Sequence, residues 1–88
     1  MAWSVEIRET AARQIARLDS QHQTRIMRFL RERLHGTIDP RNMGHALKGD
    51  LAGLWRYRVG DYRIMCHLHD EMVTVVVLEI GHRREIYR

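Results

Sequence analysis

The first part of the chain changes from strand-like alternation to helical spacing of its apolar positions. Residues 2–8 alternate apolar with polar side chains, as a half-buried strand does. Thr10 can cap the short helix that the next residues predict. The apolar face of that helix consists of Ala11, Ile15 and Leu18. The sequence therefore predicts an N-terminal strand followed by a short amphipathic helix.

A second helix is predicted between Ser20 and Gly36. The tetrapeptide Ser20-Gln21-His22-Gln23 fits a capping box, and glycine is a common residue just after a helix. The apolar stripe of this helix consists of Ile26, Phe29, Leu30 and Leu34. Its exposed face carries Arg25, Arg28, Arg31 and Arg33.

In residues 37–53 the apolar residues show neither helical nor strand-like spacing, and glycine is frequent, so this segment predicts a long connection. Three strand signals follow, over residues 54–59, 62–68 and 72–80, with Gly60-Asp61 as a hairpin turn. The order predicts an α+β fold in one domain over residues 1–88. It comprises an N-terminal strand, a two-helix hairpin and a three-stranded antiparallel meander, with both helices on one face of a twisted sheet. The other face is then partly open.

Alternation along the meander gathers arginines on that open face. The first meander strand places Arg56 and Arg58 opposite its apolar positions, and the second does the same with Arg63. A hairpin closed at residues 60–61 sets Arg58 beside Arg63, close enough to share an anion. Alternatively, these arginines form only the solvated face of a half-exposed sheet.

Composition favours a polyanionic partner. The 88 residues carry a net charge of +4, and fourteen of the fifteen basic residues are arginine, with Lys48 the exception. Arginine binds phosphate in a bidentate manner and stacks on bases, although a GC-rich genome would also enrich it. Cys66 is the single cysteine, which favours a reducing compartment, and no signal peptide or membrane span is evident. We therefore expect a cytoplasmic protein that does not contact the membrane.

The last residues add further candidate chemistry. Gly81-His82-Arg83-Arg84-Glu85-Ile86-Tyr87 follows the third meander strand and brings two arginines, an imidazole and a phenol. Together with LKGDLAGLWRYRVGDYRIM (residues 47–65), this ending resembles the RelE branch of the RelE/ParE toxin superfamily. The resemblance covers the whole chain and implies a RelE-like fold.

The resemblance implies a type II toxin that is a ribosome-dependent endoribonuclease cutting mRNA. It implies silencing by a RelB-like antitoxin, with a toxin that is monomeric alone and hetero-oligomeric in the complex. The catalytic residues that it implies are Arg56, Arg58, Arg63, Arg83 and Tyr87. The chain departs from the family pattern in having arginine where lysine is usual at positions 56 and 58, and in a shorter segment between Arg83 and Tyr87.

RNA cleavage by 2′-OH attack needs a base, an acid and positive charge around the phosphorus. An arginine, with a pKa above about 12, cannot act as a useful base. Arg56, Arg58 and Arg63 are therefore interpreted as electrostatic clamps and Arg83 as a phosphate ligand that neutralises the leaving oxygen. Tyr87 is the candidate base, and His82 is an alternative acid–base group or else a turn residue. Lys48 and Arg84 are candidate RNA contacts.

No cofactor is expected, because arginines supply the positive charge and no carboxylate cluster suited to Mg²⁺ lies on the same face. His67 and His69 share a strand face but lack a second half of a metal motif. Cys66 falls on the apolar side of its strand and is expected to be buried. Two other functions stay open: a non-catalytic ParE-like toxin that binds DNA gyrase, and an inactive partner that tunes an antitoxin's DNA binding.

Overall fold

A computed structural model of the chain describes residues 2–82. The strands are β1 (Ser4–Ile7), β2 (His45–Ala46), β3 (Leu54–Val59), β4 (Tyr62–His69) and β5 (Thr74–His82). The α-helices are α1 (Glu9–Ala16) and α2 (Ser20–Arg28), and two 3₁₀ turns cover Pro40–Met43 and Gly49–Leu51. α2 continues as a wider π-helical segment, Phe29–Leu34, in which the His35 amide donates to the Leu30 carbonyl at 2.9 Å.

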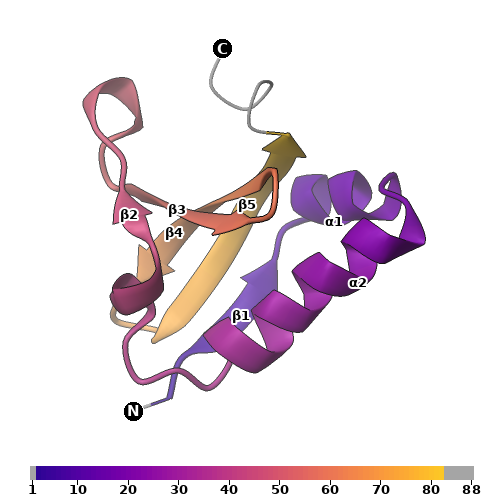
Figure 1. The fold of residues 1–88 in the computed structure, drawn as a ribbon. Helices are drawn as coiled ribbons and strands as arrows, with labels where there is room; N and C mark the ends of the chain where they lie inside the picture. Colours follow the sequence, from indigo (N-terminus) through magenta and orange to yellow (C-terminus); the bar gives the residue numbers. More distant parts are fainter. Residues whose placement is uncertain (1, 83–88) are drawn as a thin grey trace.

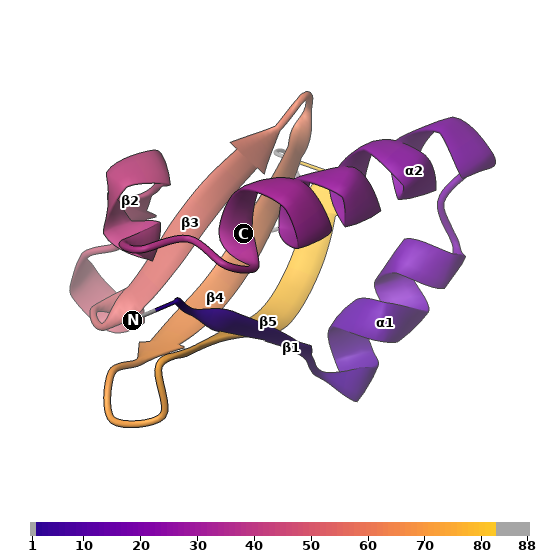
Figure 2. The same ribbon diagram turned by 90° about the horizontal axis from the view of Figure 1, so that it is seen from below.

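The strands form one mixed sheet in the order β1-β5-β4-β3-β2. β1 runs parallel to β5, and the other neighbouring strands are antiparallel. Figure 1 shows α1 and α2 side by side against the sheet. Figure 2, seen from below, places β1 beside β5 and β2 at the opposite edge. The predicted α+β fold with both helices on one face is confirmed.

The core lies between the helices and the sheet, where the alternation in β3, β4 and β5 directs apolar side chains. Cys66 is buried there as expected, and burial raises the pKa of its thiol. Trp55 is partly buried and packs against the core. The fully buried large side chains include Ile26, Leu30, Leu34, Tyr57, Ile64, Val75 and Val77.

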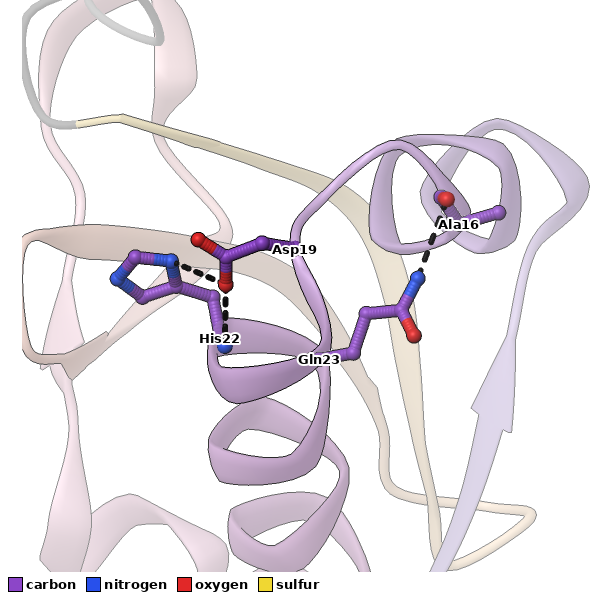
Figure 3. Close-up of polar contacts among 4 residues, drawn as sticks. All are labelled: Ala16, Asp19, His22 and Gln23. Carbon is purple, nitrogen blue, oxygen red and sulfur yellow. Dashed lines mark hydrogen bonds and ion pairs between the residues drawn. The ribbon is translucent and has the colours of Figure 1, made fainter.

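The helix starts differ from those predicted. Thr10 lies inside the first turn of α1, and the N-cap, Arg8, makes no side-chain capping bond. The N-cap of α2 is Asp19, whose carboxylate accepts from the His22 amide at 2.9 Å (Figure 3). That amide hydrogen bond lowers the pKa of Asp19, and the His22 ring lies 3.0 Å from the same oxygen. Asp19 therefore displaces Ser20 from the capping position, because a carboxylate also suits the positive end of the helix dipole.

Gln23 does not complete the predicted capping box. Its side-chain amide instead donates to the Ala16 carbonyl at 3.1 Å (Figure 3). This bond satisfies one of the carbonyl groups left open at the end of α1 and joins the two helices at their turn. The predicted stop at Gly36 is confirmed, since Gly36 has a φ of 86° immediately after the helical segment.

The predicted unstructured connection contains a short strand and is tied to the sheet. β2 lies on the outer edge of β3, so the sheet gains a strand that the sequence did not predict. The hydroxyl of Tyr57 donates to the Pro40 carbonyl at 2.8 Å, and both residues are buried. Burial raises the pKa of the Tyr57 phenol, which keeps it a proton donor. The strand limits also differ, because β4 extends to His69 and β5 spans Thr74–His82 instead of starting at Met72.

Arg41 fixes the same connection to a second part of the fold. Its guanidinium is 2.8 Å from a carboxylate oxygen of Asp70, in the turn between β4 and β5. It also lies 5.8 Å from the ring centroids of Trp3 and Trp55. Gly44 completes the attachment, because a Cβ there would lie 2.7 Å from the Tyr57 ring and 2.8 Å from the Arg56 carbonyl. The segment reaches the sheet this closely only because residue 44 has no side chain.

Candidate functional site

Three arginines from two neighbouring strands line one cleft on the sheet face opposite the helices. We call this cavity of about 330 Å³ the arginine cleft; its lining residues are Met43, His45, Arg56, Arg58 and Arg63. Arg58 and Arg63 are directly paired across β3 and β4. The predicted proximity of these two arginines is therefore confirmed, and Arg56 joins them two residues earlier on β3.

The three guanidinium groups differ in exposure. Arg63 is 9% exposed, Arg56 is half-buried and Arg58 is exposed. Within residues 2–82, no acidic side chain lines the arginine cleft. Guanidinium groups that line one cavity create a local positive potential, which attracts a phosphate group. The exposed position of Arg58 leaves the cleft accessible from solvent.

A second, larger cavity continues the positive surface toward α2. We call this cavity of about 590 Å³ the helix groove; it shares Met43 and Arg58 with the arginine cleft. The Arg25 guanidinium reaches the β3–β4 hairpin and lies 3.0 Å from the position that a Cβ on Gly60 would take. The other lining residues are Arg28, Phe29, Glu32, Arg33, Asn42 and Val59. Three of the four arginines expected on the exposed helix face therefore line a groove that adjoins the arginine cleft.

The structure separates His82 from the arginine cleft. His82 pairs with Tyr62 across β4 and β5, and the two rings are 5.9 Å apart in an edge-to-face arrangement. The cavity that His82 lines is shared with Gln14 and Arg17 of the α1 region, on the helix side of the sheet. Gln14 accepts from the Ile80 amide at 2.6 Å, which attaches α1 to this end of β5.

The remaining sequence-derived candidates lie elsewhere or outside the description. Lys48 is exposed just before the second 3₁₀ turn and is absent from the lining of the arginine cleft. Arg83, Arg84 and Tyr87 lie outside the described residues. His67 and His69 have ring centroids 5.7 Å apart, and over residues 2–82 no third ligand-type side chain joins them in a metal-sized group.

Sequence reasoning missed two of the lining residues, Met43 and His45. His45 lies on β2 directly opposite Arg56. A strand of two residues is too short to show alternation, so the hydrophobic pattern contained no signal for it.

Comparison with known proteins assigns the family. Residues 5–87 match the sequence model of the ParE toxin of type II toxin–antitoxin systems, parDE. The chain belongs to this family. Toxin RelG of Mycobacterium tuberculosis is 33% identical over 88 residues, which are 100% of this chain and 99% of RelG. Toxin RelE of the same organism is 33% identical over 86 residues, 98% of this chain and 87% of that toxin. These relatives place the chain in the RelE branch, as the sequence resemblance implied.

Solved structures agree with the assignment of this RelE-branch toxin. The RelBE2 toxin–antitoxin complex of Mycobacterium tuberculosis contains a chain with a TM-score of 0.86 and 30% identity, covering 94% of this chain and all of that one. A chain of the RelE–RelB complex from Pyrococcus horikoshii has a TM-score of 0.72 and 26% identity, with coverage of 97% and 99%. Across residues 2–82, no helix of the toxin is long and apolar enough to span a membrane.

Proposed function

We propose that this toxin is a ribosome-dependent endoribonuclease that cleaves mRNA and thereby inhibits translation in the cytoplasm. The observation that carries the proposal is the arginine cleft, in which Arg56, Arg58 and Arg63 converge on the open sheet face. Membership of the RelE branch supports the same function.

The proposed reaction is attack of the 2′-OH on the adjacent phosphorus, with departure of the 5′ oxygen. The phosphorane that forms carries more negative charge than the starting diester, so the three guanidinium groups stabilise it more than the substrate. This stabilisation requires no metal ion, since the arginines carry the charge that a divalent cation would supply. Arg83 and Tyr87 are proposed to complete the site, Arg83 by neutralising the leaving oxygen and Tyr87 by transferring a proton. Lys48 and Arg84 are proposed to contact flanking RNA.

The proposed partners are the ribosome, its mRNA and a RelB-like antitoxin. Two of the similar structures are complexes of a RelE-type toxin with its antitoxin. We expect the toxin alone to be monomeric and the inhibited form to be a hetero-oligomer. Acidic side chains of an antitoxin that enter the arginine cleft would occupy the groups needed for phosphate and so prevent cleavage.

The decisive experiment is expression of the toxin without an antitoxin, followed by mapping of transcript ends. We expect growth arrest and new 5′ ends inside translated regions within minutes of induction. Purified toxin should cut a model mRNA on programmed ribosomes and leave the same RNA intact without ribosomes. Intact transcripts in arrested cells would contradict the proposal. Loss of negative supercoiling control in those cells would instead favour the gyrase-binding alternative, to which the parDE family match lends support.

A further inference from the structure

Cleavage by 2′-OH attack needs a group that takes the 2′ proton, and the arginines cannot supply it. Guanidinium groups stay protonated at every physiological pH. Of the five described residues that line the arginine cleft, three are arginines, Met43 is apolar, and His45 alone has a side-chain nitrogen that can accept a proton from a hydroxyl group. The arrangement of this cleft therefore raises the question of whether His45 takes part in the chemistry.

The strand register places His45 where a base would be needed. His45 and Arg56 are directly opposite each other in the antiparallel pair β2–β3. The Cβ atoms of such a pair are about 4.5–5.5 Å apart and their side chains leave the same face of the sheet. Arg58 and Arg63 form the next row on that face. A phosphate held by these arginines consequently lies within reach of the imidazole.

The segment that carries His45 is held in place by buried contacts. Immediately before it, Gly44 packs against the ring of Tyr57 and the carbonyl of Arg56, and Tyr57 also binds the Pro40 carbonyl. Arg41 ties the same segment to Asp70. His45 itself is exposed, so its ring is accessible to a ligand while its backbone is fixed. This combination is typical of a residue that meets a substrate, whereas a histidine in an unanchored loop would vary in position.

We propose that His45 is the general base of this toxin and accepts the 2′-OH proton during mRNA cleavage. The inference rests on the proposed ribonuclease function and adds to it a catalytic residue from β2. Among residues 2–82, the charged groups that line the cleft with His45 are Arg56 and Arg58 of β3 and Arg63 of β4, and the remaining lining residue, Met43, is uncharged.

In this step the 2′ oxygen gives its proton to an imidazole nitrogen of His45 and forms a bond to phosphorus. The bond from phosphorus to the 5′ oxygen breaks, and that oxygen takes a proton from Tyr87 or from water. The products are a 2′,3′-cyclic phosphate and a 5′-OH end, and His45 then returns its proton to solvent. The role proposed for Tyr87 thereby becomes that of the acid.

The test is single-turnover cleavage of a model mRNA by saturating toxin on programmed ribosomes, between pH 5.5 and 8.5. The variants are His45→Gln and His45→Ala, with His69→Gln as the matched control. His69 is on the same sheet face but at the far end of β4, in a separate cavity lined by Leu54 and Leu78. Each variant is first shown to keep the wild-type thermal unfolding temperature, which is expected because His45 is exposed.

In the wild type the rate should fall toward acid pH, as the base becomes protonated. His45→Gln should lower the rate at pH 7.5 by about 10²-fold or more, which is the usual contribution of a general base. The remaining rate should no longer fall toward acid pH. Added imidazole should restore part of the activity of His45→Ala, while His69→Gln should cleave as the wild type does.

An unchanged rate and pH profile in His45→Gln would overturn the inference. So would a lower rate that keeps the wild-type pH dependence and shows no rescue by imidazole, because that result means that His45 only holds RNA or shapes the cleft. Failure of the wild type to cleave mRNA on ribosomes would be a different result. It would overturn the ribonuclease function itself, and the role of His45 with it.

Discussion

Removing the hydroxyl of Tyr57 should loosen the segment that carries His45 without opening the core. Tyr57→Phe keeps the fully buried ring, so no cavity forms, but it removes the 2.8 Å hydrogen bond to the Pro40 carbonyl. A buried acceptor that loses its donor costs about 1–3 kcal/mol. In a domain of this size 1 kcal/mol lowers Tm by about 4–8 °C, so a cost of about 1–3 kcal/mol should lower Tm by roughly 4–24 °C. The free energy of unfolding from urea titration should fall by the corresponding amount.

Tyr62→Phe is the matched control for this measurement. Tyr62 is half-buried against His22 and His82, and its hydroxyl has no hydrogen bond among residues 2–82. Its loss should change stability by less than about 0.5 kcal/mol. Tyr57→Phe should also slow mRNA cleavage at temperatures where it is fully folded, because Met43 and His45 follow the released segment. Equal stability of Tyr57→Phe and the wild type would refute the anchoring role of this hydrogen bond.

Three further outcomes are expected. Arg63→Ala should lower the cleavage rate by about 10²–10³-fold with the fold retained. Arg31 lies on the exposed helix surface outside both cavities, so Arg31→Ala should cleave at the wild-type rate. Full activity of folded Arg63→Ala would mean that the site lies elsewhere. The free energy of unfolding should fall as pH rises above about 8.5, by up to about 1.4 kcal/mol per pH unit. In that range the unfolded chain releases the Cys66 proton, whereas the buried thiol of the folded state, whose pKa is raised, retains it. Urea titrations at pH 7.5 and 9.5 measure this fall, and the free energy of unfolding of Cys66→Ala should decrease less between the two pH values than that of the wild type. Deletion of Tyr87 and Arg88 should slow cleavage by about 10²-fold or more, while thermal stability and antitoxin affinity stay nearly unchanged. Normal cleavage by the truncated protein would exclude Tyr87 from the reaction.

The elements with a clear hydrophobic period could be predicted from the sequence. The limits of β3 match the prediction, and alternation along β3 and β4 correctly placed Arg58 beside Arg63. The two helices could be predicted equally well, but their predicted N-capping residues were wrong by one position or more. Capping depends on which side chain the turn brings to the open amides, and Asp19 and Ser20 are both suitable residue types.

β2 could not be predicted, because its place in the sheet depends on contacts far away in the sequence. His45–Ala46 joins β3 only because Pro40, Arg41 and Gly44 are fixed by Tyr57, Asp70 and the two tryptophans. None of these contacts has a local sequence signal. His45, the one histidine among the described residues that line the arginine cleft, was therefore missed, although the three arginines of the cleft were found.

The shape of the surface bears on the simpler interpretation that the arginines form a solvated sheet face. A solvated arginine keeps its guanidinium in water and covers apolar surface only with its methylene groups, and it needs no neighbour of the same charge. Arg56, Arg58 and Arg63 instead come from two neighbouring strands and line one cavity. Like charges that line a concave surface focus a positive potential there, which arginines spread over a flat face do not. A phosphate that enters such a cavity can accept charge-assisted hydrogen bonds from more than one guanidinium group. The shared cavity of the three arginines thus favours an anion-binding site over a merely solvated face.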